Sequence, residues 1–333
     1  TDRSLSFLGD YNNIQMGLVP LFFLSAYAFL VTQVFVTHVQ RLRLLGCLAL
    51  SGVLSAIWFI ADKFGYLDFA SFGARISNTV SISNSEFGFF LALIVCGSVC
   101  ALSLKKQNIW LDTVAMMCGL ISLVVVFSSG FRVVYILLAI CLAVVLAFML
   151  TFIDRLRLHW VTATFGLIVV CVLFIFLKTP RLFNFELPVE VSLGVGTSYE
   201  IAWDTLTDTA KQFMLGSGPS TFVYDFSSYR PENLNLNNFA WRVRFAKPFA
   251  TFVSMIAEWG VLGVLSFLFI VLILCGFLGT RWMQAMGKNG EHDANADDEK
   301  MAFLYLIAPL WIASVIAMFF VHVSIVLWFV WFV

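Results

Sequence analysis

The sequence predicts an all-α fold: a polytopic bundle of at least eight transmembrane helices with one large external loop that contains short helices. The composition gives the first reason, because 61% of the residues are hydrophobic and only 12% are charged. Soluble domains carry roughly 25% charged residues. The second reason is that the apolar residues form long runs, and a helix satisfies the backbone hydrogen bonds of such a run within lipid. The runs do not alternate in polarity, as the strands of a membrane barrel would.

Eight apolar runs each come close to the ~20 residues that a membrane-spanning helix needs. A ninth run, residues 323–333, is shorter and is either an incomplete span or a continuation of the eighth. The runs divide the chain into helices 1 to 6 over residues 1–177, a polar loop over residues 178–248, and helices 7 to 8 or 9 over residues 249–333. Because the chain begins at Thr1 and stops inside an apolar run, we expect it to be part of a longer protein. The eight runs are residues 16–36, 44–61, 87–104, 109–127, 133–152, 160–177, 261–278 and 303–321.

Lysine and arginine residues in the short connections predict the orientation, because such residues gather in cytoplasmic loops. Basic pairs follow the first, third and fifth runs, and this alternation is what a multi-pass chain requires. The loop over residues 178–248 is then external, together with residues 62–86 and 128–132. The basic pairs are Arg41 with Arg43, Lys105 with Lys106, and Arg155 with Arg157.

The predicted outer face keeps six arginines, although arginine is disfavoured in translocated loops near membrane ends. A guanidinium group stays charged and binds two phosphate oxygens at once. We therefore predict a site for a lipid-linked phosphate or pyrophosphate on this face, with anchoring to lipid headgroups as the alternative for each side chain. The six are Arg75, Arg132, Arg181, Arg230, Arg242 and Arg244.

The external loop has the pattern of an ordered lid. Residues 197–211 have helical spacing, with apolar side chains on one face and charged side chains on the other. Glycine and proline within residues 215–219 end that helix, and the aromatic side chains of residues 221–229 suit the membrane interface. Residues 249–259 predict a half-helix or interfacial helix that leads into the seventh span.

Neither a cofactor nor a metal is predicted. No P-loop, GxGxxG or HExxH motif occurs. The seven cysteines all lie in apolar runs, where they are expected as small buried side chains. The formal net charge of zero argues against a nucleic-acid partner. Ion-coupled transport would call for acidic side chains at mid-membrane, which the runs do not provide.

Three segments, in order, resemble the O-antigen ligase and polymerase superfamily. They are residues 198–203 (SYEIAW), residues 215–222 (LGSGPSTF) and residues 258–263 (EWGVLG). Residues 75–80 (RISNTV), followed by an asparagine, and residues 129–132 (SGFR) resemble two further elements of that family upstream. The ligases also carry a histidine shortly before the glutamate of the last segment, and this chain departs from that pattern.

The resemblance implies a glycosyltransferase in a bacterial cytoplasmic (inner) membrane, multi-pass, with its active face external, toward the periplasm. Such an enzyme takes a glycan from a polyprenyl-pyrophosphate donor and transfers it to a glycan, lipid or protein acceptor. Its other partner is membrane lipid, and it needs no nucleotide sugar and usually no metal. A polymerase of the same superfamily is the nearest alternative. A non-catalytic scaffold that binds lipid or glycan is the alternative from another class, with a transporter or flippase third.

Two carboxylates are the predicted catalytic residues, because a carboxyl group near apolar walls can have a raised pKa and act as a base. Glu258 is the first candidate and Glu232 the second. The alternative for Glu258 is a structural ion pair or a position at the start of a helix.

The predicted substrate-binding residues are mostly cationic, because charge accumulates on the leaving pyrophosphate as the glycosidic bond breaks. Four arginines are predicted to clamp that group. Tyr229 with Arg230 is predicted to orient a sugar or a phosphate, with a simple turn as the alternative. The four are Arg75, Arg132, Arg242 and Arg244.

Overall fold

The computed structural model describes residues 3–9, 16–35, 37–64, 83–105, 109–152, 156–177, 191–235, 242–287, 294–323, 327–328 and 331. Within these ranges the regular structure is helical, apart from one isolated bridge between Leu104 and Leu156. Six of these helices are long and apolar enough to cross a membrane. The all-α class is therefore confirmed for the described residues, and these six helices are candidate membrane spans by length and composition.

Each of the eight predicted apolar runs coincides with a helix. The six long ones are α3 (His38–Lys63), α4 (Asn84–Ser103), α5 (Ile109–Ser128), α6 (Arg132–Thr151), α7 (Leu158–Phe176) and α12 (Thr251–Gly287). The apolar parts of α2 (Leu18–Val34) and α13 (Ala294–Ala317) are shorter than a full span. That these two also cross the membrane stays a prediction, as does the ninth run, which lies mostly outside the described residues.

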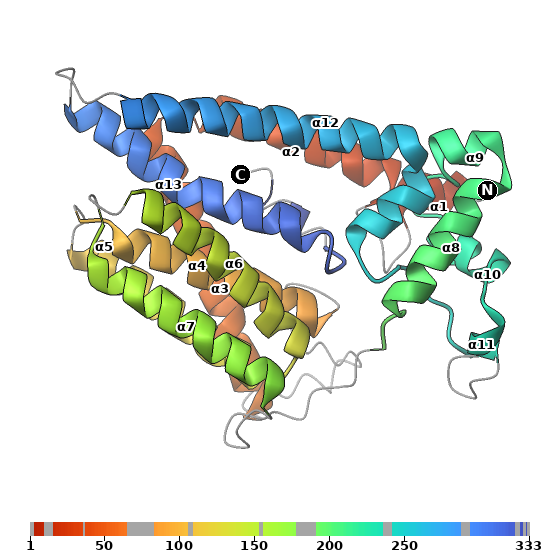
Figure 1. The fold of residues 1–333 in the computed structure, drawn as a ribbon, viewed down its shortest axis with the longest axis horizontal. Coiled ribbons are helices and arrows are strands. Elements are labelled where there is room, and N and C mark those ends of the chain that lie inside the picture. Colours follow the sequence, from red (N-terminus) through yellow and green to blue (C-terminus); the bar gives the residue numbers. More distant parts are fainter. Residues whose placement is uncertain are drawn as a thin grey trace. The chain divides into compact units, whose positions relative to one another are not determined.

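The chain forms two compact units, and the first comprises Phe35–Glu190 with Trp282–Ile316. Its centre is α4, which packs against α3, α5, α6 and α7 (Figure 1). Of the most apolar window of α4, 83% is buried, against 22% for α5 and 17% for α7. A helix that is apolar on every side belongs in the interior, while its neighbours expose their outer faces to lipid. Small residues allow the close approach: Gly88 of α4 meets Val134 of α6.

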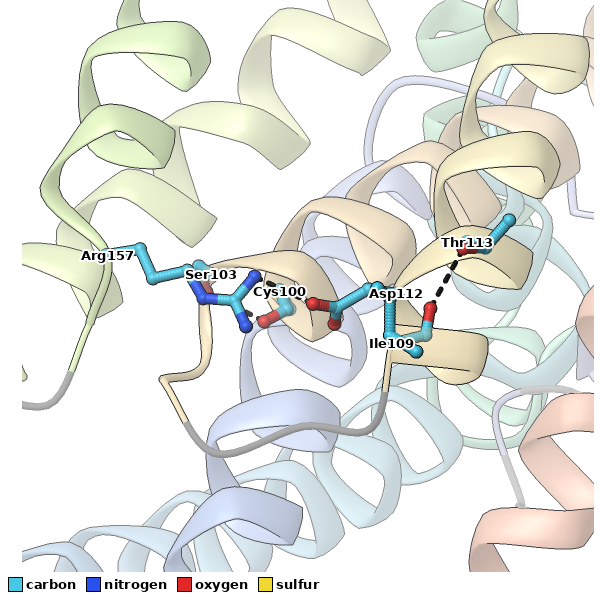
Figure 2. A network of polar contacts seen from close by, with 6 residues as sticks. All are labelled: Cys100, Ser103, Ile109, Asp112, Thr113 and Arg157. Carbon is cyan, nitrogen blue, oxygen red and sulfur yellow. Dashed lines mark hydrogen bonds and ion pairs between the residues drawn. The ribbon is translucent and has the colours of Figure 1, made fainter.

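A polar network joins one end of this bundle (Figure 2). The Arg157 guanidinium binds the Asp112 carboxylate at 2.8 Å, and the Arg157 N–H donates to the Ser103 carbonyl at 2.9 Å. The Ser103 hydroxyl donates to the Cys100 carbonyl at 2.7 Å. These contacts place the basic connections that follow α4 and α6 at the same end of the bundle, as the predicted alternation requires. The leaflet that this end faces stays a prediction.

The second unit comprises Thr1–Val34, Val191–Arg281 and Ala317–Val333. After α1 (Arg3–Leu8) and α2, it contains four short helices between residues 195 and 235 and most of α12. The four are α8 (Val195–Asp208), α9 (Ala210–Leu215), α10 (Phe222–Ser228) and α11 (Glu232–Asn235). Short helices thus occur where the loop is predicted to hold them, and its external position stays a prediction.

One apolar cluster holds these short helices against the start of α12. The predicted inner face of α8 is buried, and its residues Ile201 and Ala202 pack with Phe222 and Phe226 of α10 and Ala257 of α12. The single helix predicted over residues 197–211 is instead two. The chain is extended at Thr209, whose hydroxyl accepts the Gln212 N–H and caps the start of α9.

Candidate functional site

A sharp bend in α12 organises the candidate site. The bend lies at Gly260, where φ is 63° and ψ is −167°, so the helical hydrogen bonds are interrupted there. The carbonyls of Ala257 and Glu258 instead accept the N–H groups of Ser217 and Gly218, each at 3.0 Å. The turn between α9 and α10, residues 216–221, is thereby attached to the backbone of α12.

Two glycines make this attachment possible. Gly216 has a φ of 72°, and a Cβ at that position would lie 2.6 Å from the Trp259 nitrogen. A Cβ at Gly260 would overlap the Gly216 nitrogen and lie 2.8 Å from the Leu215 nitrogen. Because only glycine lets two backbones approach this closely, Gly216 and Gly260 allow the turn to pack against α12.

Glu258, the first predicted catalytic residue, is fully buried beside this turn. Its carboxylate accepts the Ser220 N–H at 2.9 Å and the Phe222 N–H at 3.3 Å. Ser220 has a φ of 58°, a conformation that costs energy in a residue with a side chain. The carboxylate therefore holds a strained turn in place, and a role as catalytic base stays a prediction.

A cavity of about 520 Å³ opens beside the turn. This volume falls within the ~300–1,000 Å³ that small-molecule sites occupy. Its lining residues supply four hydroxyl groups and one amide, together with one cation and one carboxyl group. The lining residues are Thr209, Lys211, Gln212, Gly216, Ser217, Thr221, Tyr224 and Asp225.

The carboxyl group of the cavity, Asp225, is only 6% exposed and belongs to a compact cluster of hydrogen bonds. The Ser217 hydroxyl lies 2.6 Å from Asp225 Oδ2, 2.7 Å from Thr221 Oγ1 and 3.3 Å from the Ala257 carbonyl oxygen. The Thr221 hydroxyl lies 2.6 Å from the Gly218 carbonyl oxygen. Burial raises the pKa of Asp225 from 3.8 to about 7, although the hydrogen bond from Ser217 opposes the rise.

Asp225 should make stability depend on pH. The pKa of Asp225 is higher in the folded state than in the unfolded state. Its stabilisation of the fold is therefore complete below pH 4 and is lost as pH rises through about 7. At about 1.36 kcal/mol per pKa unit, the rise from 3.8 to about 7 changes the free energy of unfolding by about 4 kcal/mol across this pH range. Asp225→Asn carries no charge, so its melting temperature in detergent should equal or trail the wild type at pH 5 and exceed it at pH 8.5.

The matched control is Asp204→Asn, which changes an exposed aspartate of α8 in the same unit. Its melting temperature should differ from that of the wild type by the same small amount at both pH values. A melting temperature of Asp225→Asn that follows the wild type across this range would contradict the assignment.

Two predicted substrate-binding residues follow α10. The Tyr229 pKa is raised, first by burial and then by a hydrogen bond with Asp208. The Arg230 guanidinium lies over the Phe226 ring, 5.4 Å from its centroid. Both residues are half-buried, whereas Glu232, the second predicted catalytic residue, is exposed on α11.

The remaining predicted arginines are not gathered into one group by the described contacts. Arg242 and Arg244 are exposed in the segment that leads into α12. Arg132 is exposed at the start of α6, which belongs to the other unit. Arg75 and Arg181 lie outside the described residues. The clamp therefore stays a prediction.

A histidine comes to the start of α12 from the end of the chain. The Thr251 N–H donates to the Val321 carbonyl at 3.1 Å, and the Thr251 hydroxyl accepts the Val323 N–H at 2.7 Å. His322, between these partners, is buried, and its pKa is lowered by burial and then by the nearby Lys247. Its place beside α12 depends on tertiary structure, so sequence spacing gives no signal for it.

The cavity and its cluster offer chemistry for a ligand rich in hydroxyl groups, together with one group that can take up a proton near neutral pH. In the described part of the chain, no three His, Cys, Asp or Glu side chains are grouped to hold a metal ion. Comparisons with protein-family models, curated proteins and solved structures find no match to this chain.

Proposed function

We propose that this protein is a membrane glycosyltransferase that moves a glycan from a polyprenyl-pyrophosphate donor to an acceptor at the outer face of the cytoplasmic membrane. One observation carries the proposal. The three segments that resemble O-antigen ligases, residues 198–203, 215–222 and 258–263, are separate in sequence and meet in the fold. The Glu258 carboxylate joins the third segment to the second. Ile201 and Ala202 of the first segment belong to the same apolar cluster as Phe222 of the second.

The lining of the cavity supports a sugar as the ligand. Sugars present hydroxyl groups that both donate and accept hydrogen bonds, and hydroxyl and amide side chains do the same. Five such side chains line the cavity, beside a single carboxyl group and a single lysine.

The membrane-spanning helices support a lipid-linked donor. A polyprenyl chain stays within the bilayer, so an enzyme that uses it must lie in the membrane beside it. The six long apolar helices meet that requirement. The pyrophosphate of such a donor calls for cations, and exposed Arg132, Arg242 and Arg244 are accessible to an anionic ligand.

The test uses purified protein in phospholipid vesicles with a polyprenyl pyrophosphate that carries a radiolabelled oligosaccharide. Acceptors are offered separately: a lipid A-core, a second lipid-linked glycan, and a protein fraction. We expect labelled product to form, and the amount of polyprenyl pyrophosphate released should be proportional to the amount of that product. Binding of the donor without release of polyprenyl pyrophosphate would favour the non-catalytic scaffold that binds lipid or glycan. Transfer only to the second lipid-linked glycan would favour a polymerase.

The predicted arginine clamp is tested in the same assay. Replacing Arg75, Arg132, Arg242 or Arg244 by alanine should each lower the rate of transfer by about 10²-fold, because preorganised charge stabilises the leaving pyrophosphate. Arg281→Ala is the control, because this exposed arginine lies at the opposite end of α12. Full activity of all four variants at normal protein level would exclude the clamp.

A further inference from the structure

We propose that Asp225 is the residue that accepts the proton of the acceptor hydroxyl during glycan transfer. This inference rests on the proposed function and names the base of its chemical step. It differs from the sequence prediction, which places that role on Glu258 or Glu232.

The position of Asp225 is the first argument. Among the residues that line the cavity, it provides the carboxyl group, and Ser217 holds its Oδ2 atom at 2.6 Å. Glu258 lies close by, but its two oxygens accept the backbone N–H groups of Ser220 and Phe222. Glu232 is exposed on α11 and does not line the cavity. A hydroxyl group bound in the cavity therefore meets Asp225.

The hydrogen-bond cluster is the second argument, because its hydroxyl groups can pair with Asp225 in either charge state. Ser217 and Thr221 carry one hydroxyl proton each. When Asp225 is charged, the Ser217 hydroxyl donates to its Oδ2 atom, and the Thr221 hydroxyl donates to the Gly218 carbonyl. When Asp225 is protonated, it can donate to the Ser217 oxygen, and Ser217 can turn its own proton to the Ala257 carbonyl at 3.3 Å. The cluster accommodates Asp225 in both states, as a group that exchanges protons requires.

The titration of Asp225 agrees with this role, because a pKa of about 7 lies near the operating pH of a good catalytic base. The charged and titratable groups that face it come from several elements. Lys211 of α9 and Tyr224 of α10 line the same cavity. Tyr229 follows on the far end of α10, and Glu258 of α12 binds the N-terminal side of that helix.

The step is a displacement at the anomeric carbon of the donor sugar. The oxygen of the acceptor hydroxyl forms a bond to that carbon, and the bond from the carbon to the pyrophosphate oxygen breaks. The electron pair of the broken bond leaves with polyprenyl pyrophosphate. The hydroxyl proton goes to the Asp225 carboxylate and then to water. Atoms and charge balance without a further reactant.

The test is the pH dependence of transfer from the labelled polyprenyl-pyrophosphate glycan, in vesicles. For the wild type, kcat/KM should rise about tenfold per pH unit below pH 7 and level off above it. Asp225→Asn should lower kcat/KM by about 10²–10⁴-fold and abolish this rise. Asp225→Glu should restore part of the rate and the rise. Asp204→Asn, the exposed control, should keep the wild-type profile.

A second variant keeps the inference testable if Asp225→Asn fails to fold. The hydrogen bond from Ser217 lowers the pKa of Asp225, so Ser217→Ala should move the rise in kcat/KM to higher pH. If the rise in kcat/KM stays at the wild-type pH in Ser217→Ala, or persists in a folded Asp225→Asn, the role of Asp225 is overturned. The proposed function would stand in that case. No transfer by the wild type at any pH would overturn the proposed function, and the assigned proton transfer with it.

Discussion

Gly260→Ala is expected to cost the fold most of its stability. The backbone at Gly260 has a φ of 63° and a ψ of −167°, a region that is essentially restricted to glycine. The added methyl group would also lie 2.8 Å from the Leu215 nitrogen and overlap the Gly216 nitrogen. Backbone strain of about 1–3 kcal/mol and overpacking of about 1–3 kcal/mol together give roughly 4 kcal/mol. We expect a large fall in melting temperature and in the yield of monodisperse protein in detergent.

The matched control for this substitution lies in the same helix. Gly276 of α12 has ordinary helical geometry, and a Cβ there would meet no atom within 4 Å. Gly276→Ala should leave the melting temperature unchanged or raise it slightly, because alanine favours a helix by about 1 kcal/mol over glycine. Equal behaviour of the two variants would contradict the packing of the 216–221 turn on α12.

Glu258→Ala is expected to have the second largest effect. It removes the acceptor of two N–H groups, those of Ser220 and Phe222, in a fully buried place. Each such loss costs about 1–3 kcal/mol, and the emptied volume adds to it, so about 3–5 kcal/mol is expected. Glu258→Gln retains one acceptor oxygen and should lie between alanine and the wild type in melting temperature.

The same variants separate a structural role of Glu258 from a catalytic one. A structural role predicts that transfer activity per folded molecule survives in Glu258→Gln while the melting temperature falls. A catalytic role predicts lost activity in Glu258→Gln at a nearly unchanged melting temperature. Glu200→Gln, an exposed change on α8, serves as the control for both measurements.

Much of the helical framework follows from hydrophobic patterning, because membrane-spanning helices are defined by length and polarity alone. The bend in α12 could be anticipated in part, since residues 249–259 predict a separate half-helix before the seventh span. Its sharpness could not, because it depends on contacts between Gly260 and a turn remote in sequence. The break at Thr209 was also missed, since its neighbours continue a helical pattern across it.

The candidate site could be predicted only in outline. Glu258 stands out because a carboxylate beside apolar residues is conspicuous in sequence. Asp225 does not, because it lies in an aromatic stretch that suits the membrane interface, and its burial arises from the packing of α10 on α8 and α12. Hydroxyl residues such as Ser217 are too common to be informative until the fold brings them to a carboxyl group.

The attachment of α12 to the 216–221 turn has a consequence for synthesis. Domains are made from the N-terminus, so the turn leaves the ribosome before the helix that it binds. The carbonyls of Ala257 and Glu258 therefore find their N–H donors already present when α12 is translated. The earlier segment is thus available to pair with the later one as soon as the later one is made.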